Sequence, residues 1–131
     1  LDTHNSDLSN FILQLNYQTS FPEFATYHIR QDIIGFVELA NKVDLAFVEC
    51  KNTPLSLLHL SQLIGYSCIA LPVYSILLSP KGMGSTLNRL LRTYNRRDAL
   101  EFRPNRRIDV IKWDYLKQDA DRTNSIIHQR F

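Results

Sequence analysis

The chain has few of the residues that build disulfide frameworks, membrane spans or nucleotide-binding loops. Its two cysteines, Cys50 and Cys68, are too few for a dense disulfide framework and too far apart for a CxxC metal site. Polar residues and a proline interrupt residues 55–78, so no apolar run reaches the roughly 18 residues of a membrane span. The GxxxxGK[ST] and HExxH spacings are also missing. These absences predict a soluble, intracellular and cytoplasmic protein with reduced thiols and no membrane partner.

The length and composition are those of one ordinary folded domain. The chain has 131 residues, of which 44% are hydrophobic and 21% are charged. This balance excludes disorder and fibrous repeats, and the length supports one hydrophobic core rather than two. We therefore expect a single domain over residues 1–131, with a loosely attached polar tail from about residue 117.

Positive charge is concentrated in one segment. Residues 1–51 hold seven acids and three bases, whereas residues 81–112 hold nine bases and three acids. Such a segment attracts polyanions, of which nucleic acid is the commonest, although a solvated helix face with surplus arginine has the same composition. The candidate DNA-binding residues are Lys81, Arg89, Arg92, Arg96 and Arg97.

The first half of the chain predicts a helix followed by strands. Apolar residues at helical spacing predict a helix over about 6–18, capped by Asn5 or Ser6. Aromatic and β-branched residues predict a strand over 23–30. Two clearer strands, 32–39 and 44–51, are joined by a hairpin that we expect to turn near residues 41 and 42.

The second half predicts a buried helix, two further strands and a third helix. Thr53 and Pro54 are a helix-start signal for residues 54–69, and the runs 73–78 and 107–113 read as strands on either side of a helix over 85–101. The resulting order predicts an α/β fold with a mixed sheet.

Acidic and basic side chains gather where the hairpin strands end. Glu49 and Lys51 share a face because strand side chains alternate, and a turn near 41 and 42 places Asp32 across from Lys51 and beside Glu49. Two carboxylates, aided by the backbone carbonyl of Cys50, suit Mg²⁺ or Mn²⁺. Lys51 would orient water or stabilise charge on a phosphate, which suits phosphodiester hydrolysis.

These residues resemble the PD-(D/E)XK nuclease superfamily, whose core is a restriction-endonuclease-like mixed central sheet flanked by helices in the order αβββαβ. Gln31-Asp32 stands where the family often has Pro-Asp, and Glu49-Cys50-Lys51 matches the (D/E)XK element. The resemblance implies that Asp32 and Glu49 bind metal and that Lys51 is catalytic. A further Glu supplies a metal ligand in many such nucleases, and Glu23 is the candidate here, although an ordinary strand-edge Glu would look the same.

A second match lies on the predicted helix 54–69. Gln62 and Tyr66 fit the Q-x-x-x-Y signature of RecB-like members, and with His59 they form a stripe on one helix face. The same stripe also fits the polar edge of a buried helix. The resemblance to RecB-like nucleases implies that Gln62 and Tyr66 contact Lys51, the attacking water or a DNA phosphate. The glycine-containing stretch 79–86, which includes Lys81, is a further candidate for contact with backbone phosphate.

The resemblance implies a Mg²⁺-dependent deoxyribonuclease, expected to act as an endonuclease. The alternative is a catalytically inactive nucleic-acid-binding or assembly module of the same fold. Because one small domain has limited surface for reading bases, a homodimer or a larger parent protein would supply further contacts.

Overall fold

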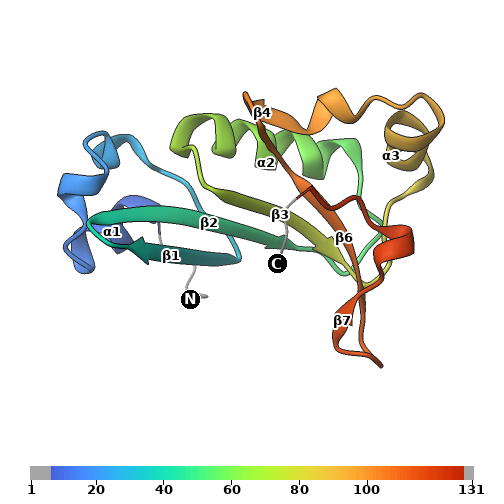
Figure 1. Cartoon of the computed structure of the whole chain (residues 1–131), viewed down its shortest axis with the longest axis horizontal. Coiled ribbons are helices and arrows are strands. Elements are labelled where there is room, and N and C mark those ends of the chain that lie inside the picture. The colour runs from blue at the N-terminus through green and yellow to red at the C-terminus, as the bar shows by residue number, and fades with distance from the viewer. Residues whose placement is uncertain (1–6, 129–131) are drawn as a thin grey trace.

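The computed structural model describes residues 7–128, and a five-stranded mixed sheet organises them (Figure 1). Its strands are β1 (Ile33–Leu39), β2 (Lys42–Cys50), β3 (Tyr74–Ser79), β6 (Asp109–Asp114) and β7 (Asp119–Ala120), in that spatial order. β2 runs parallel to β3 and β3 parallel to β6, while β1 and β7 pair antiparallel with their neighbours. The predicted mixed α/β architecture is therefore confirmed.

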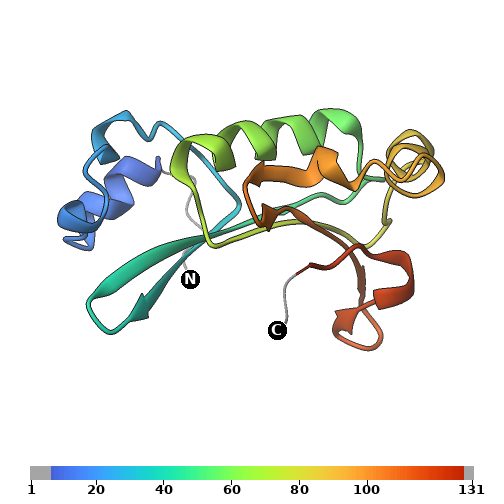
Figure 2. The same ribbon diagram turned by 45° about the horizontal axis from the view of Figure 1, so that its top comes forward.

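Helices cover one face of this sheet. The helices are α1 (Leu8–Gln14), α2 (Leu57–Ala70) and α3 (Ser85–Asn88), and Figure 2 shows α2 and α3 on the same side. A hydrogen bond of 2.8 Å between the buried hydroxyls of Ser67 and Ser75 joins α2 to β3. None of the helices in residues 7–128 is both long and apolar enough to cross a membrane.

The predicted strand 23–30 is wrong. The chain forms a short 3-10 turn at Phe24–Thr26 and then an extended segment outside the sheet. Tyr27 and Ile29 are buried in alternation, as in a strand, but their carbonyls accept hydrogen bonds from the first N–H groups of α1. Within residues 7–128, the predicted αβββαβ order thus lacks its first strand.

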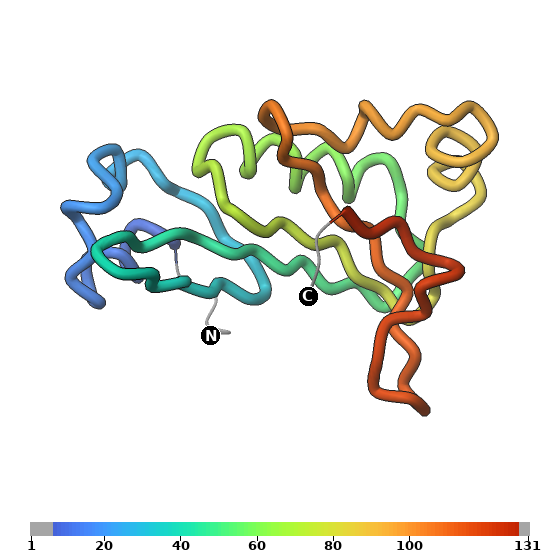
Figure 3. The backbone as a smooth tube through the Cα atoms, in the orientation of Figure 1, coloured from blue at the N-terminus to red at the C-terminus, as the bar shows by residue number. Residues whose placement is uncertain are grey.

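The hairpin turns earlier than expected. Leu39 pairs with Lys42, so the turn residues are Ala40 and Asn41, and Ile33 pairs with Val48. Extending this register by one pair puts Asp32 opposite Glu49 rather than opposite Lys51. β2 also extends past the start of β3, whose first residue pairs with Ala46, and Figure 3 follows the hairpin out beyond β3.

Two of the three predicted helices are much shorter than expected. The first spans only Leu8–Gln14 and begins after Asp7, and the proposed caps Asn5 and Ser6 lie outside the described residues. The third is α3 continued by one π-helical turn, Arg89–Thr93. It ends before Asn95, whose φ of 52° is incompatible with a helix, and a separate 3-10 turn covers Arg97–Leu100.

The second helix closely matches its prediction, apart from its start. α2 begins after Ser56 rather than at Thr53 and Pro54, because Leu55 is held by backbone hydrogen bonds to Gly82 and Gly84. Its C-terminal end and the following strand β3 agree with the predicted boundaries to within one residue. A short hairpin, β4 (Glu101–Arg103) and β5 (Arg106–Arg107), precedes β6 and was not expected.

Residues 117–128 pack against the rest of the fold, which differs from the loosely attached tail expected from about residue 117, and residues 129–131 lie outside the described residues. β7 pairs with β6, and the backbone of Ile126 exchanges two hydrogen bonds with Val110 at 2.8 and 2.9 Å. The Ile126 side chain is only 3% exposed and joins the same core cluster as Leu8 and Phe47.

We expect Ile126→Ala to lower the free energy of unfolding by about 2–5 kcal/mol, because it removes buried methyl groups and leaves a cavity. Urea denaturation followed by circular dichroism measures this loss. Leu116→Ala is the matched control, because Leu116 is 97% exposed in the neighbouring hairpin and its truncation should change stability by less than about 0.5 kcal/mol. Equal effects of the two substitutions would contradict the packing of this segment.

Candidate active site

Asp32 and Glu49 form the centre of the candidate site at the open end of the β1–β2 hairpin. Directly opposed residues of an antiparallel pair share a face, so both side chains lie on the face that carries α2. Asp32 Oδ2 accepts a hydrogen bond of 2.8 Å from the backbone N–H of Cys50. This hydrogen bond holds the Asp32 carboxylate at the end of β2, the strand that carries Glu49.

Lys51 lies beside this carboxylate pair. Its Nζ is 3.3 Å from Glu49 Oε1, and the two side chains are 31% and 18% exposed. The Lys51 backbone N–H donates to the carbonyl of Leu78 at 2.9 Å, so the end of β2 is anchored to β3. The structure therefore brings Asp32, Glu49 and Lys51 together, as the spacing predicted, although in a register shifted from the expected one.

The electrostatics of the site favour a bound cation. Partial burial raises the pKa of the Glu49 carboxyl above its ordinary value, and the negative charge of Asp32 raises it further, while Lys51 opposes both effects. Two carboxylates face one ammonium, so the cluster carries an excess of negative charge. A divalent cation would remove the repulsion that raises this pKa.

The donor set also suits a hard metal ion. In a strand the N–H and C=O of one residue point to the same side, so the Cys50 carbonyl faces the side on which Asp32 accepts the Cys50 N–H. Asp32, Glu49 and this carbonyl would together supply only oxygen ligands, which Mg²⁺ and Mn²⁺ prefer. Among residues 7–128, no cluster of three or more His, Cys, Asp or Glu side chains could hold a metal, so the donor set described here is two carboxylates and one backbone carbonyl.

A cavity of about 120 Å³ connects Glu49 to α2. Gln62 and Tyr66 both line it, so this part of the predicted helix stripe does point toward the carboxylate cluster. Two neighbours were not anticipated, Arg30 and Gln31, and the Gln31 side chain is buried at 4% exposure. Its Oε1 has no hydrogen-bond partner within residues 7–128. In the sequence, the apolar residues Tyr27 and Ile29 alternate with polar ones. This alternation, continued by two residues, would have placed Gln31 on the buried side.

His59, the third member of the stripe, has a structural role at the start of α2. Its Nδ1 accepts a hydrogen bond of 3.1 Å from the N–H of Ser56, whose hydroxyl accepts from the His59 N–H in return. This capping box begins the helix. Burial lowers the pKa of His59 and the nearby charge of Lys51 lowers it further, and both effects favour the neutral ring, whose Nδ1 can accept the capping hydrogen bond.

Glu23 does not reach the cluster. It precedes the 3-10 turn Phe24–Thr26 and lines a pocket with Asn41 and Asp44, at the closed end of the hairpin. Asp44 and Glu49 are five residues apart on β2, a separation of roughly 16 Å at about 3.3 Å per residue. The suggested metal role for Glu23 is therefore not supported, because the strand that would have carried it toward Asp32 is absent.

The predicted arginine face is only partly present. Arg89 and Arg97 are exposed, but Arg92 donates to the carbonyls of Thr123 and Ser125 at 2.9 and 3.2 Å. Arg96 follows the end of the helix and forms two hydrogen bonds of 2.9 Å with Asp98. Arg89, Arg92 and Arg96 consequently do not form one continuous row on a helix.

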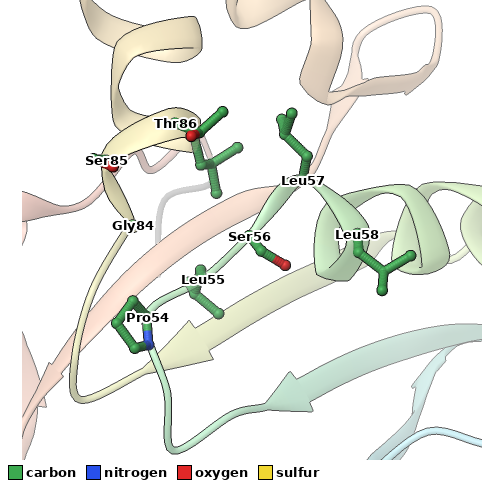
Figure 4. Close-up of a pocket in the computed structure, with 9 residues that line it drawn as sticks. Pro54, Leu55, Ser56, Leu57, Leu58, Gly84, Ser85 and Thr86 are labelled. Carbon is green, nitrogen blue, oxygen red and sulfur yellow. The ribbon is translucent and has the colours of Figure 1, made fainter.

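The stretch 79–86 contributes to two different pockets. Gly84, Ser85 and Thr86 face the start of α2 across an open pocket of about 440 Å³, whose other wall includes Leu57 and Leu58 (Figure 4). These leucine side chains make that pocket largely apolar and poorly suited to phosphate. Lys81 lies in a separate pocket with other basic residues.

We expect Glu49→Gln to raise the thermal stability of the protein in EDTA at pH 7.5. The folded-state pKa of Glu49 is raised above its unfolded value, so the ionised carboxylate disfavours folding, and the amide removes this cost. The loss of folding free energy caused by the ionised Glu49 is complete above the folded-state pKa. It disappears below about pH 4.5, the ordinary pKa of a glutamate. Melting temperatures of both proteins should therefore converge on acidification, and a difference that persists at low pH would contradict this account. Asp44→Asn, at the far end of β2, is the control and should not raise the melting temperature in EDTA, because Asp44 is paired with Lys42.

Comparisons with known proteins do not place the chain in a family. No family model matches the sequence, and neither curated proteins nor solved structures give a match. The likeness to PD-(D/E)XK nucleases therefore rests on the residues described above and on their arrangement.

Proposed function

We propose that this chain is a metal-dependent nuclease that hydrolyses phosphodiester bonds in DNA. The observation that supports this most is the cluster at the end of β2, where Asp32 and Glu49 share one face beside Lys51. Gln62 and Tyr66 line the cavity next to Glu49 and supply neutral polar groups. Carboxylates, an ammonium and neutral donors are the groups that phosphodiester hydrolysis uses when no covalent enzyme intermediate forms.

Each residue has a distinct role in the proposed reaction. Water adds to phosphorus, one P–O ester bond breaks, and the products are a phosphate monoester and an alcohol. A bound Mg²⁺ or Mn²⁺, held by Asp32, Glu49 and the Cys50 carbonyl, would polarise a phosphate oxygen and make water more acidic. Lys51 stabilises the negative charge that develops on the phosphate, because its ammonium is held close to Glu49 without being fully buried.

Gln62 and Tyr66 would position the reactants rather than transfer protons. Their amide and phenol groups can donate hydrogen bonds to a phosphate oxygen or orient the attacking water. Both project from one face of α2, and the capping box at Ser56 and His59 fixes the start of that helix. The site thus combines a strand end with one rigid helix.

We expect Asp32→Asn and Glu49→Gln each to abolish Mn²⁺ binding and to lower DNA cleavage at least about a hundredfold, because each removes a charged oxygen ligand. Calorimetry with Mn²⁺ and cleavage of a labelled duplex measure the two effects. Asp44→Asn is the control, since Asp44 pairs with Lys42 near the hairpin turn and should leave both unchanged. Nicking of a closed circular plasmid would identify endonuclease action.

DNA binding by the wild type without any cleavage, in Mg²⁺ or Mn²⁺, would reject the nuclease assignment. That result would instead support the inactive nucleic-acid-binding module. Unchanged cleavage in either carboxylate variant, with a folded protein, would show that the reaction occurs elsewhere.

We expect Lys51→Ala to separate catalysis from metal binding. An ammonium cannot coordinate a cation, so the variant should bind Mn²⁺ at least as tightly as the wild type while losing about a hundredfold or more in cleavage rate. Lys42→Ala removes an equal charge at the hairpin turn and should cleave normally. A folded Lys51→Ala protein that binds no Mn²⁺ would mean that Lys51 supports the metal site rather than the reaction.

A further inference from the structure

A small basic pocket lies apart from the carboxylate cluster. Its volume is about 100 Å³, roughly three times the share of one water molecule in the liquid. Three cationic side chains line it from three separate parts of the chain, together with two carboxamides, a glycine and the side chain of Met83. The charged, amide and glycine residues are Lys81, Lys112, Arg92, Asn88, Asn124 and Gly82.

The sheet brings these residues together. β3 and β6 are parallel neighbours, and Ser79 at the end of β3 pairs with Lys112. The chain then turns at Gly82, whose φ is 68°, a conformation that other residues rarely adopt. A Cβ on Gly82 would lie 3.2 Å from Lys112 Cδ, so the absence of a side chain there lets the Lys112 stem pass close to the turn. The pairing of β3 with β6 and the turn at Gly82 therefore position the pocket residues, so the pocket does not depend on flexible lysine side chains alone.

Arg92 forms the most rigid part of the pocket. Its Nη2 donates to the carbonyls of Thr123 and Ser125, which holds the guanidinium in place. Its Nε is buried and has no hydrogen-bond partner within residues 7–128. A buried, unsatisfied N–H group on a cation is costly, so the fold keeps this guanidinium beside the two lysines against a local penalty.

The pocket keeps a positive charge after its acidic neighbour is counted. Asp121 lies near Lys112, and that charge helps to lower the pKa of the Asp121 carboxyl. The stronger influence on this pKa is Asn124, whose side chain donates to Asp121 Oδ2 at 2.8 Å. Three cations against one carboxylate leave an excess of positive charge.

The basic pocket and the carboxylate cluster lie along one edge of the sheet. β2, β3 and β6 are parallel, so Lys51, Lys81 and Lys112 all lie at or near the carboxyl ends of adjacent strands. β2 and β6 are two strand spacings apart, about 10 Å. Glu49, Leu77 and Val110 are in register, so Lys112, two residues beyond Val110, lies on the same face as Glu49.

We propose that the basic pocket binds one backbone phosphate of a nucleic acid strand, next to the phosphate that reaches the carboxylate cluster. This assignment rests on the proposed function, because the cluster defines where the strand must pass. Lys81, Lys112 and Arg92 provide positive charge, and the carboxamides of Asn88 and Asn124 provide neutral donors. Free phosphate shares the same chemistry, and the test separates the two sources.

The test measures binding in EDTA, where no cleavage is needed. Short labelled DNA duplexes each carry one neutral methylphosphonate, which is moved along the strand. With the wild-type protein, one position outside the cleavage site should lower affinity about tenfold or more. Lys81→Gln/Lys112→Gln should bind unmodified DNA more weakly and lose sensitivity to that one position. Lys81→Arg/Lys112→Arg should keep the sensitivity.

The control is Lys42→Gln/Lys117→Gln, which changes the net charge equally at sites outside the pocket. It should keep the wild-type methylphosphonate profile, and circular dichroism should show that every variant is folded. Identical profiles for the pocket variant and the wild type would overturn the proposal. So would inorganic phosphate shifting the amide signals of Gly82 and Asn88 while no methylphosphonate position is sensitive, because the pocket would then take only free anions.

The two proposals can fail independently. Cleavage with an unaltered methylphosphonate profile in the pocket variant would reject the pocket and keep the nuclease. A position-specific effect without cleavage in Mg²⁺ or Mn²⁺ would keep the pocket and reject the nuclease.

Discussion

The candidate site depends on one constraint, the antiparallel register between β1 and β2. This register places Asp32 opposite Glu49, and the hydrogen bond from the Cys50 N–H to Asp32 closes the pairing at the end of the hairpin. A shift by one residue would send every side chain of one strand to the other face. The parallel pairing of β2 with β3 and of β3 with β6 then aligns the basic pocket on the same edge. The chain's candidate chemistry is thus arranged by backbone hydrogen bonds rather than by contacts between functional side chains.

The carboxylate cluster places a cost on the folded state. Glu49 is partly buried next to another carboxylate, and its pKa is raised first by this burial and then by the negative charge of Asp32, while Lys51 opposes both effects. A chain selected for stability alone would place an uncharged side chain there, as it does elsewhere along the α2 face at Phe47 and Ser75. Local conflicts of this kind are expected where a protein binds a ligand that relieves them.

Local periodicity predicted the site better than it predicted the fold around it. The shared face of Glu49 and Lys51, and that of Gln62 and Tyr66, follow from alternation in strands and from helical spacing, which need no knowledge of distant residues. The predicted hairpin register differs from the observed one by two residues. Because strand side chains alternate with a period of two, Asp32 still lies on the same face as Glu49. The segment after Glu23 has a true strand pattern, but its carbonyls pair with the start of α1, a partner that periodicity cannot identify. The arginine row fails because Asn95 ends the helix and Arg92 is bound by Thr123 and Ser125, contacts between residues about thirty positions apart.

Arg92 both binds the C-terminal segment and lines the basic pocket. Its guanidinium anchors the carbonyls of Thr123 and Ser125, and the same group lines the basic pocket. Thermodynamic linkage makes such a shared group reciprocal: if docking of the C-terminal segment orients the arginine for an anion, an anion in the pocket must in turn hold the segment more firmly. Residues 121–128 would then become more resistant to proteases and to amide exchange when the pocket is occupied, although Asn124 is the one residue among them that lines it.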